Sequence, residues 1–318
     1  MLPSSSPVNS TTVRAHNPVR LARAALQAAY FVSDELGASL AERLFTTPRR
    51  YPRPDRERAI LATGRRFDVD VLLRSPRWRG QHAPIAAWRW GFGPTVLLVH
   101  GWEGRGSQLG AFVEPLVSAG LSVVAFDAPA HGDSPGSRLY LTDHADTITD
   151  LVAAIGPVHA IVAHSFGAAA VLLAHQRSGV DAARNVMVAP NVLIADAVDR
   201  FAHHVALDAR DRDTFTQYLA QQSGVSVDAL GLADLIGARD AAMLVIHDRT
   251  DREVSIEHGR RLAAQWPKAE LVTTDGLGHR RILRDPDVIA RTVAFAAHAV
   301  TVPASDLVRE VDRCLTEL

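Results

Sequence analysis

From Pro94 onward, short runs of apolar residues alternate with longer segments whose apolar residues recur at helical spacing. The short runs predict strands, and the longer segments predict helices between them. The predicted strands are 95–99, 121–126, 159–163, 185–189, 242–246 and 269–273, and the predicted helices are 110–119, 141–154, 166–176, 256–265 and 286–297. Apolar strands that alternate with helices are typical of a mostly parallel, doubly wound sheet, so the chain is predicted to have an α/β fold.

Two regions depart from this alternation. Residues 190–240 contain no convincing strand but look helical over 195–205 and 213–222, which predicts a helical lid after the sixth strand. Before the core, apolar residues at helical spacing predict one helix over Val19–Leu44, and two strands are expected at 67–73 and 85–90. We therefore expect an arginine-rich helical arm over 1–65, a core over 66–189 and 241–300, a lid over 190–240 and a C-terminal helix over 301–318.

The composition excludes several classes of protein. The 318 residues carry 34 basic and 35 acidic side chains, whereas a nucleic-acid-binding protein usually has a basic surplus. Lys268 is the single lysine and lies in a turn-like stretch, which disfavours a P-loop, a protein kinase and a pyridoxal Schiff base. Cys314 is the single cysteine, so neither an intrachain disulfide nor a cysteine-based metal site is expected.

The 14 histidines include no His-Glu-x-x-His pair, so we expect no metal, and no motif calls for an organic cofactor. No run of about 18 apolar residues occurs, so no membrane span is expected. The first 33 residues have no acid, a composition similar to that of an organellar transit peptide, but we favour a loose N-terminus of a cytoplasmic protein. The oligomeric state is open, because the Val19–Leu44 helix can pack on its own core or on another subunit.

Polar residues that follow the predicted strands are the candidates for chemistry, because catalytic groups lie at the carboxyl ends of strands in such sheets. Ser165 lies between a buried strand and a helix, with small residues two positions away on either side. A turn this tight strains the serine backbone and projects its hydroxyl beside the N–H groups of a helix N-terminus, although a serine here can also simply cap the helix. His279 in a glycine-rich loop and Asp251 after the preceding strand can provide the base and the acid that a serine nucleophile needs.

The chain order Ser, Asp, His and the stretches LLVHGW, VVAFDAPAHGDS, VAHSFGAAA, LVIHDRTDREV and GLGHRRI resemble those of α/β-hydrolase-fold serine hydrolases, over roughly residues 94–299. The Gly-x-Ser-x-Gly pattern of that family occurs here with Ala163 in place of the first glycine. The resemblance implies an α/β-hydrolase fold. It also implies hydrolysis of a carboxylic ester or related acyl bond of a small molecule through an acyl-enzyme intermediate.

The resemblance further implies a role for each residue. Ser165 is the expected nucleophile, His279 the general base and then acid, and Asp251 the carboxylate that orients the histidine. The backbone N–H groups of Trp102 and Phe166 are the expected oxyanion hole. His131 and His164 lie near this site in the sequence pattern without an expected proton transfer.

Alternatives remain open on the sequence alone. Asp248, or an acid after the sixth strand such as Asp196, could replace Asp251 as the acid. Gly104 and Gly106 after a strand, with Asp127 ending the next strand, faintly resemble a dinucleotide-binding fingerprint, although its third glycine is misplaced. We expect Asp127 and Asp133 instead to order the turn after their strand by accepting hydrogen bonds from backbone amides. A non-catalytic ligand-binding module on the same fold is the other alternative.

Overall fold

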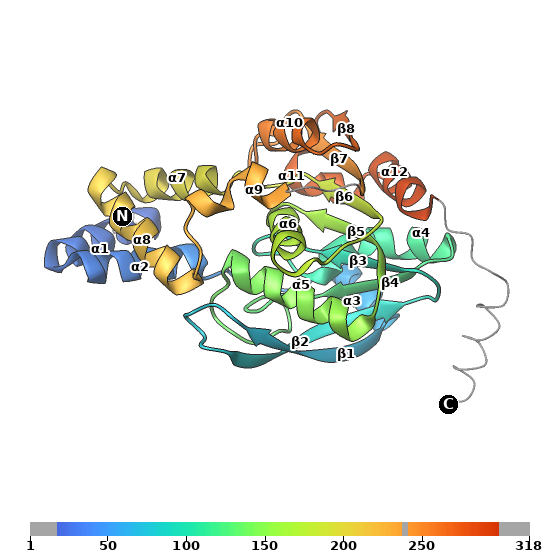
Figure 1. Ribbon diagram of the computed structural model, residues 1–318, viewed down its shortest axis with the longest axis horizontal. Helices are drawn as coiled ribbons and strands as arrows, with labels where there is room; N and C mark the ends of the chain where they lie inside the picture. Colours follow the sequence, from blue (N-terminus) through green and yellow to red (C-terminus); the bar gives the residue numbers. More distant parts are fainter. Residues whose placement is uncertain (1–17, 237–240, 299–318) are drawn as a thin grey trace, which may run out of the picture.

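A single eight-stranded sheet organises the protein (Figure 1). The structure is a computed structural model, and it describes residues 18–236 and 241–298. The strand order is β1-β2-β4-β3-β5-β6-β7-β8, in which β2 runs antiparallel to both of its neighbours and every other adjacent pair is parallel. The strands are β1 (Arg65–Leu73), β2 (Gln81–Trp90), β3 (Thr95–Val99), β4 (Ser122–Phe126), β5 (Val158–His164), β6 (Arg184–Val188), β7 (Ala242–Asp248) and β8 (Ala269–Thr274).

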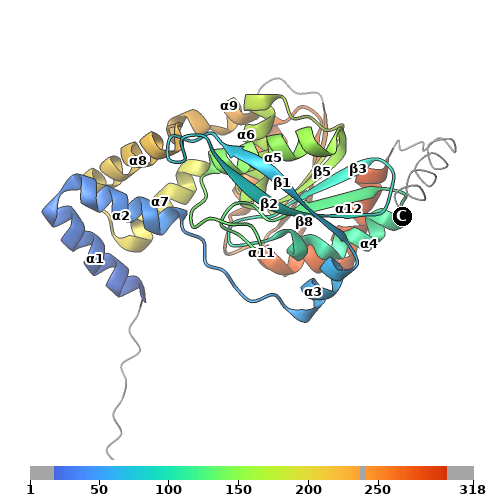
Figure 2. The ribbon, with the colours of Figure 1, turned by 90° about the horizontal axis from the view of Figure 1, so that it is seen from below.

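Alternating side chains of these strands build two cores, one on each face of the sheet. The helices around the sheet are α3 (Asp55–Ala62), η1 (Gly106–Phe112), α4 (Val113–Ser118), α5 (Leu141–Ile155), α6 (Phe166–Ser178), α10 (Ile256–Gln265), α11 (Gly278–Arg281), η3 (Ile282–Arg284) and α12 (Pro286–Ala297). On β3, Leu97 and Val99 pack in the core beneath α5, α6 and α10, whereas Val96 and Leu98 pack in the core beneath η1, α4 and α12. Figure 2 shows α5 and α6 on one side of the sheet and α4 and α12 on the other.

The predicted core strands are confirmed within a few residues at their ends, and helices α10 and α12 have the predicted bounds. The prediction of one α-helix over 110–119 was wrong, because this segment begins within η1 and becomes α-helical only at Val113. Pro115 explains the difference. A proline inside an α-helix lacks its N–H and clashes with the carbonyl four residues earlier, so it is tolerated only in the first turn, where it lies here.

The single helix expected over Val19–Leu44 was also wrong, because the segment forms α1 (Pro18–Val32) and α2 (Asp34–Thr46). Ser33 separates them in an extended conformation, and its hydroxyl accepts a hydrogen bond from the Leu36 N–H at 3.1 Å. Asp34 and Glu35 follow in the first turn, where acidic side chains stabilise a helix N-terminus. The second helix therefore has its own start signal inside a continuous apolar pattern.

The N-terminal arm and the insertion between β6 and β7, in which the sequence shows no motif, pack against each other. Helices α7 (Ile194–Val205) and α8 (Ala209–Ser223), from the insertion between β6 and β7, gather with α1 and α2 at one end of the molecule (Figures 1 and 2). Phe45 of α2, Phe201 of α7 and Phe215 of α8 form an aromatic cluster with ring centroids 5.1 to 5.6 Å apart. We call these four helices the helical cap; η2 (Asp228–Leu230) and α9 (Leu232–Ile236) lead from it back to the core.

A buried carboxylate joins the helical cap to the core. Glu42 of α2 is fully buried and accepts hydrogen bonds from the Arg138 guanidinium at 2.8 Å, from the Thr46 hydroxyl at 3.0 Å and from the Tyr140 hydroxyl. Arg138 and Tyr140 belong to the segment that enters α5. A buried charge is stable only when its lone pairs are satisfied in this way, so the network holds α2 in one position relative to the sheet.

Four histidines near the carboxyl ends of β3, β4 and β5 are buried. Burial lowers the pKa of His100 to about 4 and the pKa values of His131 and His164 to about 3, and it moves the pKa of His144 well below its usual range. His100 bridges two strand ends, since its Nδ1 lies 2.7 Å from the Gly101 carbonyl and its Nε2 accepts the Ala128 N–H at 2.9 Å. These rings are therefore neutral parts of the fold at pH 7.

The expected C-terminal helix over 301–318, with Cys314, and the expected loose N-terminus before residue 18 lie outside the described residues. Within 18–236 and 241–298, no helix combines the length and the apolarity that a membrane crossing requires. Helices α7, α8 and α9, together with η2, cover most of the insertion expected over 190–240.

The aromatic cluster predicts that the arm and the insertion unfold together. Replacing the fully buried Phe215 by Ala removes packing with Phe45 and Phe201 and leaves a cavity, so we expect a loss of about 3–5 kcal/mol in the free energy of unfolding. Urea unfolding measures this loss, and native-state proteolysis within α1 and α2 should accelerate. Phe92→Ala, at a 54% exposed ring, is the matched control and should change little. Unchanged proteolysis of α1 and α2 in Phe215→Ala would contradict the shared packing.

The buried histidines predict a steep loss of stability in mild acid. In the unfolded chain each histidine binds a proton near pH 6.5, whereas the folded protein excludes it down to about pH 3–4, so unfolding takes up protons between these values. The free energy of unfolding should therefore fall as the pH drops from 7 to 4. Four carboxyls whose pKa values burial raises act in the opposite direction: Asp127, Asp143, Asp146 and Asp211. The lowered histidines outnumber them, because burial also lowers the pKa of His258, to about 4. Urea unfolding at several pH values measures the slope; His144→Leu should reduce it by about one proton and the exposed His203→Gln should not.

Candidate active site

Ser165 occupies a strained turn between β5 and α6. Its backbone has φ +54° and ψ −123°, a positive-φ conformation that costs a non-glycine residue about 1–3 kcal/mol. The neighbouring chain leaves no room for side chains: a Cβ on Gly167 would lie 2.5 Å from the His100 carbonyl oxygen, and one on Gly101 would lie 2.8 Å from the Ser165 Cβ. Ala163 is fully buried in β5, so its methyl group fits where the family pattern has glycine.

His279 contacts both Ser165 and Asp251. Its Nε2 lies 2.9 Å from the Ser165 Oγ, and its Nδ1 lies 2.7 Å from an Asp251 carboxylate oxygen. Because a carboxylate can only accept, Nδ1 carries the hydrogen and donates a hydrogen bond to Asp251, which leaves Nε2 to accept a hydrogen bond from the Ser165 hydroxyl. The three side chains are largely buried, and they come from the ends of β5, β7 and β8. The structure thus brings together the three residues that the sequence pattern singled out.

The Asp251 carboxylate is held on several sides. Its Oδ1 accepts the backbone N–H groups of Glu253 at 2.8 Å and Val254 at 3.0 Å, and its Oδ2 lies 3.5 Å from the His247 Nε2. Burial on its own raises the pKa of Asp251, but hydrogen bonds from His247, His279 and the Val254 N–H outweigh it, and the pKa is lowered below its usual range. Asp251 is therefore a fixed negative charge next to His279. His247 was not singled out in the sequence.

Asp248 has a different place. Its carboxylate accepts the Thr250 N–H and hydroxyl at 2.9 and 2.6 Å, the Thr274 hydroxyl at 2.8 Å and the Leu277 N–H at 2.9 Å. Burial raises its pKa, but these hydrogen bonds dominate and lower it below the usual range. Asp248 thereby holds the loop that carries His279, while Asp251 makes the contact with the imidazole. The alternative assignment of Asp248 as the orienting acid does not agree with this geometry.

Asp196 also lies away from His279. It is on α7, its side chain is 53% exposed, and its carboxylate lies 3.7 Å from the Nε2 of His258. An acid that is half-exposed and faces another histidine cannot orient the imidazole of His279. The second alternative for the acid is therefore not supported either.

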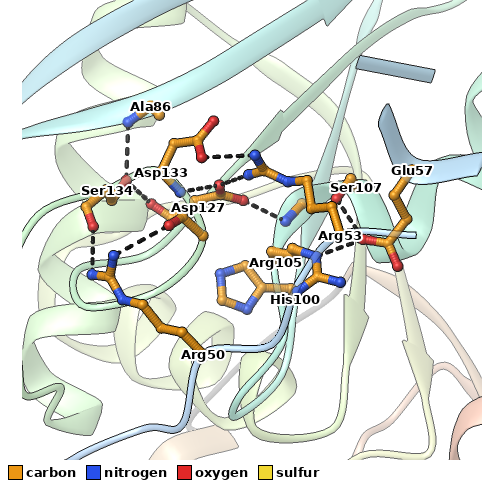
Figure 3. Close-up of polar contacts among 12 residues, drawn as sticks. Arg50, Arg53, Glu57, Ala86, His100, Arg105, Ser107, Asp127, Asp133 and Ser134 are labelled. Atoms are coloured by element: carbon orange, nitrogen blue, oxygen red, sulfur yellow. Dashed lines mark hydrogen bonds and ion pairs between the residues drawn. The ribbon is translucent and has the colours of Figure 1, made fainter. Parts of the chain in front are cut away.

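The dinucleotide alternative fails at Asp127. This fully buried carboxylate accepts the backbone N–H groups of Gly106 and Asp133, both at 2.8 Å, and pairs with Arg53 at 2.7 Å (Figure 3). In a dinucleotide-binding protein the corresponding acid contacts a ribose. Here its oxygens are used inside the protein, as expected for a residue that orders its turn. The Asp133 carboxylate also pairs with Arg53, at 2.7 Å, and no backbone N–H of the described residues donates to it, so the expectation for Asp133 was wrong.

Two backbone N–H groups close to Ser165 come from different parts of the chain. Phe166 is the first residue of α6, and Trp102 follows Gly101 at the end of β3. Neither N–H donates a hydrogen bond to another residue of the described chain. Their side chains pack together edge-to-face with ring centroids 5.9 Å apart. Free N–H donors beside a serine can stabilise a negative oxygen.

His164 supports the histidine loop. Its Nε2 donates to the backbone carbonyl of His279 at 3.0 Å, and the two rings lie 4.7 Å apart. His131 accepts the Glu103 N–H at 3.1 Å and lies 2.9 Å from the Pro129 carbonyl, so it braces the loop beside Trp102. Neither imidazole contacts the Ser165 hydroxyl among the hydrogen bonds of the described residues.

The segment between α2 and α3 contributes arginines that the sequence pattern did not assign to the site. Figure 3 shows Arg50 and Arg53 reaching the turn after β4. Arg50 donates to the carbonyls of that turn, at Ala130, Gly132, Ser134 and Gly136. Arg105 after β3 pairs with the buried Glu57 of α3 at 2.6 Å. These contacts fix the segment against the carboxyl edge of the sheet.

Two cavities meet near Ser165. One, of about 760 Å³, is lined by Ser165, His164 and His279 together with residues of the α2–α3 segment and of η3. The other, of about 330 Å³, lies between α2, α7 and the entrance to α5 and is lined mainly by apolar side chains. Trp102 and Asn191 line both. Among the described residues, no group of three or more histidine, cysteine, aspartate or glutamate side chains is placed to hold a metal ion.

Comparisons with known proteins agree with this architecture. Residues 96–292 match the alpha/beta hydrolase family. An esterase from Pyrococcus furiosus aligns with a TM-score of 0.58 and 18% identity, over 79% of this chain and 96% of that one. Est1E of Butyrivibrio proteoclasticus, solved with ferulic acid, aligns with a TM-score of 0.55 and 18% identity, over 72% of this chain and 96% of that one.

A monoacylglycerol lipase from Paleococcus ferrophilus aligns with a TM-score of 0.53 and 21% identity, over 67% of this chain and 98% of that one. At such identities the likeness shows the fold. A comparison with curated protein sequences found no match. The family match spans more than half of the chain and includes Ser165, Asp251 and His279, and the chain belongs to the alpha/beta hydrolase family.

Proposed function

We propose that the protein is a serine hydrolase that cleaves a carboxylic ester, or a related acyl bond, of a small molecule through an acyl-enzyme. The observation that carries the proposal is the hydrogen-bonded path from Asp251 through His279 to Ser165, with distances of 2.7 and 2.9 Å. A serine hydroxyl is a weak nucleophile until a base removes its proton, and this path supplies that base in a fixed orientation.

The reaction follows from the atoms in place. As the Ser165 Oγ attacks the acyl carbon, His279 Nε2 takes its proton, and the carbonyl oxygen becomes an oxyanion between the N–H groups of Trp102 and Phe166. The charged Asp251 stabilises the imidazolium. His279 then gives its proton to the departing oxygen, which leaves the acyl group on Ser165. Water, activated by the same imidazole, attacks this ester and regenerates the serine.

We further propose that the insertion over 190–240 acts as a lid together with the arm. This is supported by the apolar cavity, which Phe45 of α2, Val198 and Phe201 of α7 and Leu219 of α8 line together. The C-terminal helix over 301–318 remains part of the proposed domain division. We propose a cytoplasmic enzyme without a metal or organic cofactor, which is consistent with the net charge of −1 and the single cysteine.

Replacing the serine tests the proposal directly. Ser165→Ala should lower kcat for 4-nitrophenyl butyrate by about 10⁴–10⁶-fold with an unchanged fold, because the nucleophile is lost and only binding and the oxyanion hole remain. A fluorophosphonate probe should label the wild type and not the variant. Ser255→Ala, at the N-cap of α10, is the matched control and should retain labelling. Equal turnover in wild type and Ser165→Ala would refute the assignment of Ser165, and absence of labelling of the folded wild type would favour a non-catalytic binding module.

A pair of asparagine variants distinguishes the two aspartates. Asp251→Asn should lower kcat by about 10⁴-fold, because asparagine favours the wrong histidine tautomer. Asp248→Asn should lower the free energy of unfolding by about 1–3 kcal/mol through lost hydrogen bonds to the histidine loop and affect kcat far less. Steady-state kinetics and urea unfolding of both variants measure this. A larger loss of kcat in Asp248→Asn than in Asp251→Asn would reverse the assignment.

A further inference from the structure

The larger cavity above Ser165 is lined by charged side chains that the reaction does not use. Its lining includes five arginines: Arg49, Arg56, Arg105, Arg280 and Arg284. They come from the α2–α3 segment and the start of α3, from the loop after β3 and from the turn that follows His279. Chemistry on an uncharged ester needs none of these charges, so they call for a separate explanation.

Glutamates neutralise three of these cations. The pairs lie 2.6 to 3.0 Å apart and are Arg105–Glu57, Arg49–Glu103 and Arg280–Glu253. Arg56 and Arg284 have no carboxylate partner among the described residues, and both are exposed. The cavity therefore has a positive surplus at its mouth, in a protein whose overall charge is slightly negative.

The two cavities differ in the residues near Ser165 that line them. His279, which must protonate the leaving oxygen, lines the arginine-bearing cavity, and Arg284 follows it by five residues on the same helical stretch. Phe166 lines only the apolar cavity, and Trp102 lines both. A leaving group that takes its proton from His279 would therefore lie on the cationic side, and an acyl chain that extends past Phe166 would lie on the apolar side.

We propose that the substrate is an ester of an apolar acid with an alcohol that bears an anionic group, phosphate or carboxylate, and that Arg56 and Arg284 bind this group. The inference rests on the proposed hydrolase function and names its substrate class. Guanidinium groups suit both anions because their forked N–H donors match the oxygens of phosphate and carboxylate. A cavity of about 760 Å³ has room for such a headgroup beside Ser165.

A matched set of esters tests the proposal. The probes are 1-butyrylglycerol 3-phosphate, 3-O-butyrylglycerate and the uncharged 1-butyrylglycerol, which share the acyl group and differ in charge. The wild type should prefer at least one anionic ester over the uncharged one by about tenfold or more in kcat/KM, mainly through KM. Arg56→Gln combined with Arg284→Gln should bring this ratio close to one, and added salt should lower it in the wild type.

Arg291→Gln is the matched control, because Arg291 is an exposed arginine on α12 that lines neither cavity. In this variant the ratio of kcat/KM for the anionic ester to kcat/KM for the uncharged ester should equal that of the wild type. A preference for the phosphate or for the carboxylate ester identifies the anion, and either one supports the proposal. Equal kcat/KM for charged and uncharged esters in the wild type, or a preference that survives the double substitution, would overturn it.

Binding separates this inference from the proposed function. Titration of the same esters into Ser165→Ala protein, which cannot form an acyl-enzyme, should show tighter binding of the anionic esters by about tenfold, lost when Arg56 and Arg284 are also replaced. Such binding supports the anion site even if the wild type turns over none of the esters, a result that would overturn only the hydrolase proposal. Equal binding of charged and uncharged esters would overturn the anion site even if all are hydrolysed.

Discussion

The close approach of the end of β3 to the first turn of α6 is the constraint on which the site depends. Only glycine fits at positions 101 and 167, because a Cβ at either would meet neighbouring atoms of Ser165 or of the His100 carbonyl within 3 Å. This contact holds Ser165 in its positive-φ conformation and brings the end of β3, with Gly101 and Trp102, close to Ser165. The strain is maintained by the fully buried strands on both sides of the turn.

The histidine side of the site depends on hydrogen bonds instead of packing. Asp248 fastens the loop after β8 to the end of β7, and His164 holds the carbonyl of His279. Asp251 is fixed by the amides of its own loop before it meets the imidazole. Both aspartates must stay charged to do this, which agrees with the direction of their pKa shifts.

The sequence predicted the core and the residues brought together at Ser165, because apolar strand runs and strand-end residues are local signals. It did not predict where α1 and α2 would pack, since an amphipathic helix indicates that one face is buried but not against what. The aromatic contacts of Phe45 with Phe201 and Phe215 join segments more than 150 residues apart. The division between α1 and α2 has a local signal, the N-cap serine Ser33 followed by two acidic residues. The apolar pattern continues across Ser33, however, and predicts one helix. The role of Arg50 depends on carbonyls that only the folded turn presents.

The segment between α2 and α3 supports the candidate active site through direct contacts with the loops after β3 and β4. Arg49 pairs with Glu103, which has a positive φ of 54° and lies next to Trp102. His131 accepts the Glu103 N–H, and Arg50 holds the turn on which His131 lies. The conformation that presents the Trp102 N–H is thus maintained by residues far earlier in the chain. The same segment leads directly into Arg56. In our proposals, therefore, the stretch of backbone that positions the oxyanion donor also sets the charge at the cavity mouth, and this couples the recognition of a charged substrate to the catalytic geometry.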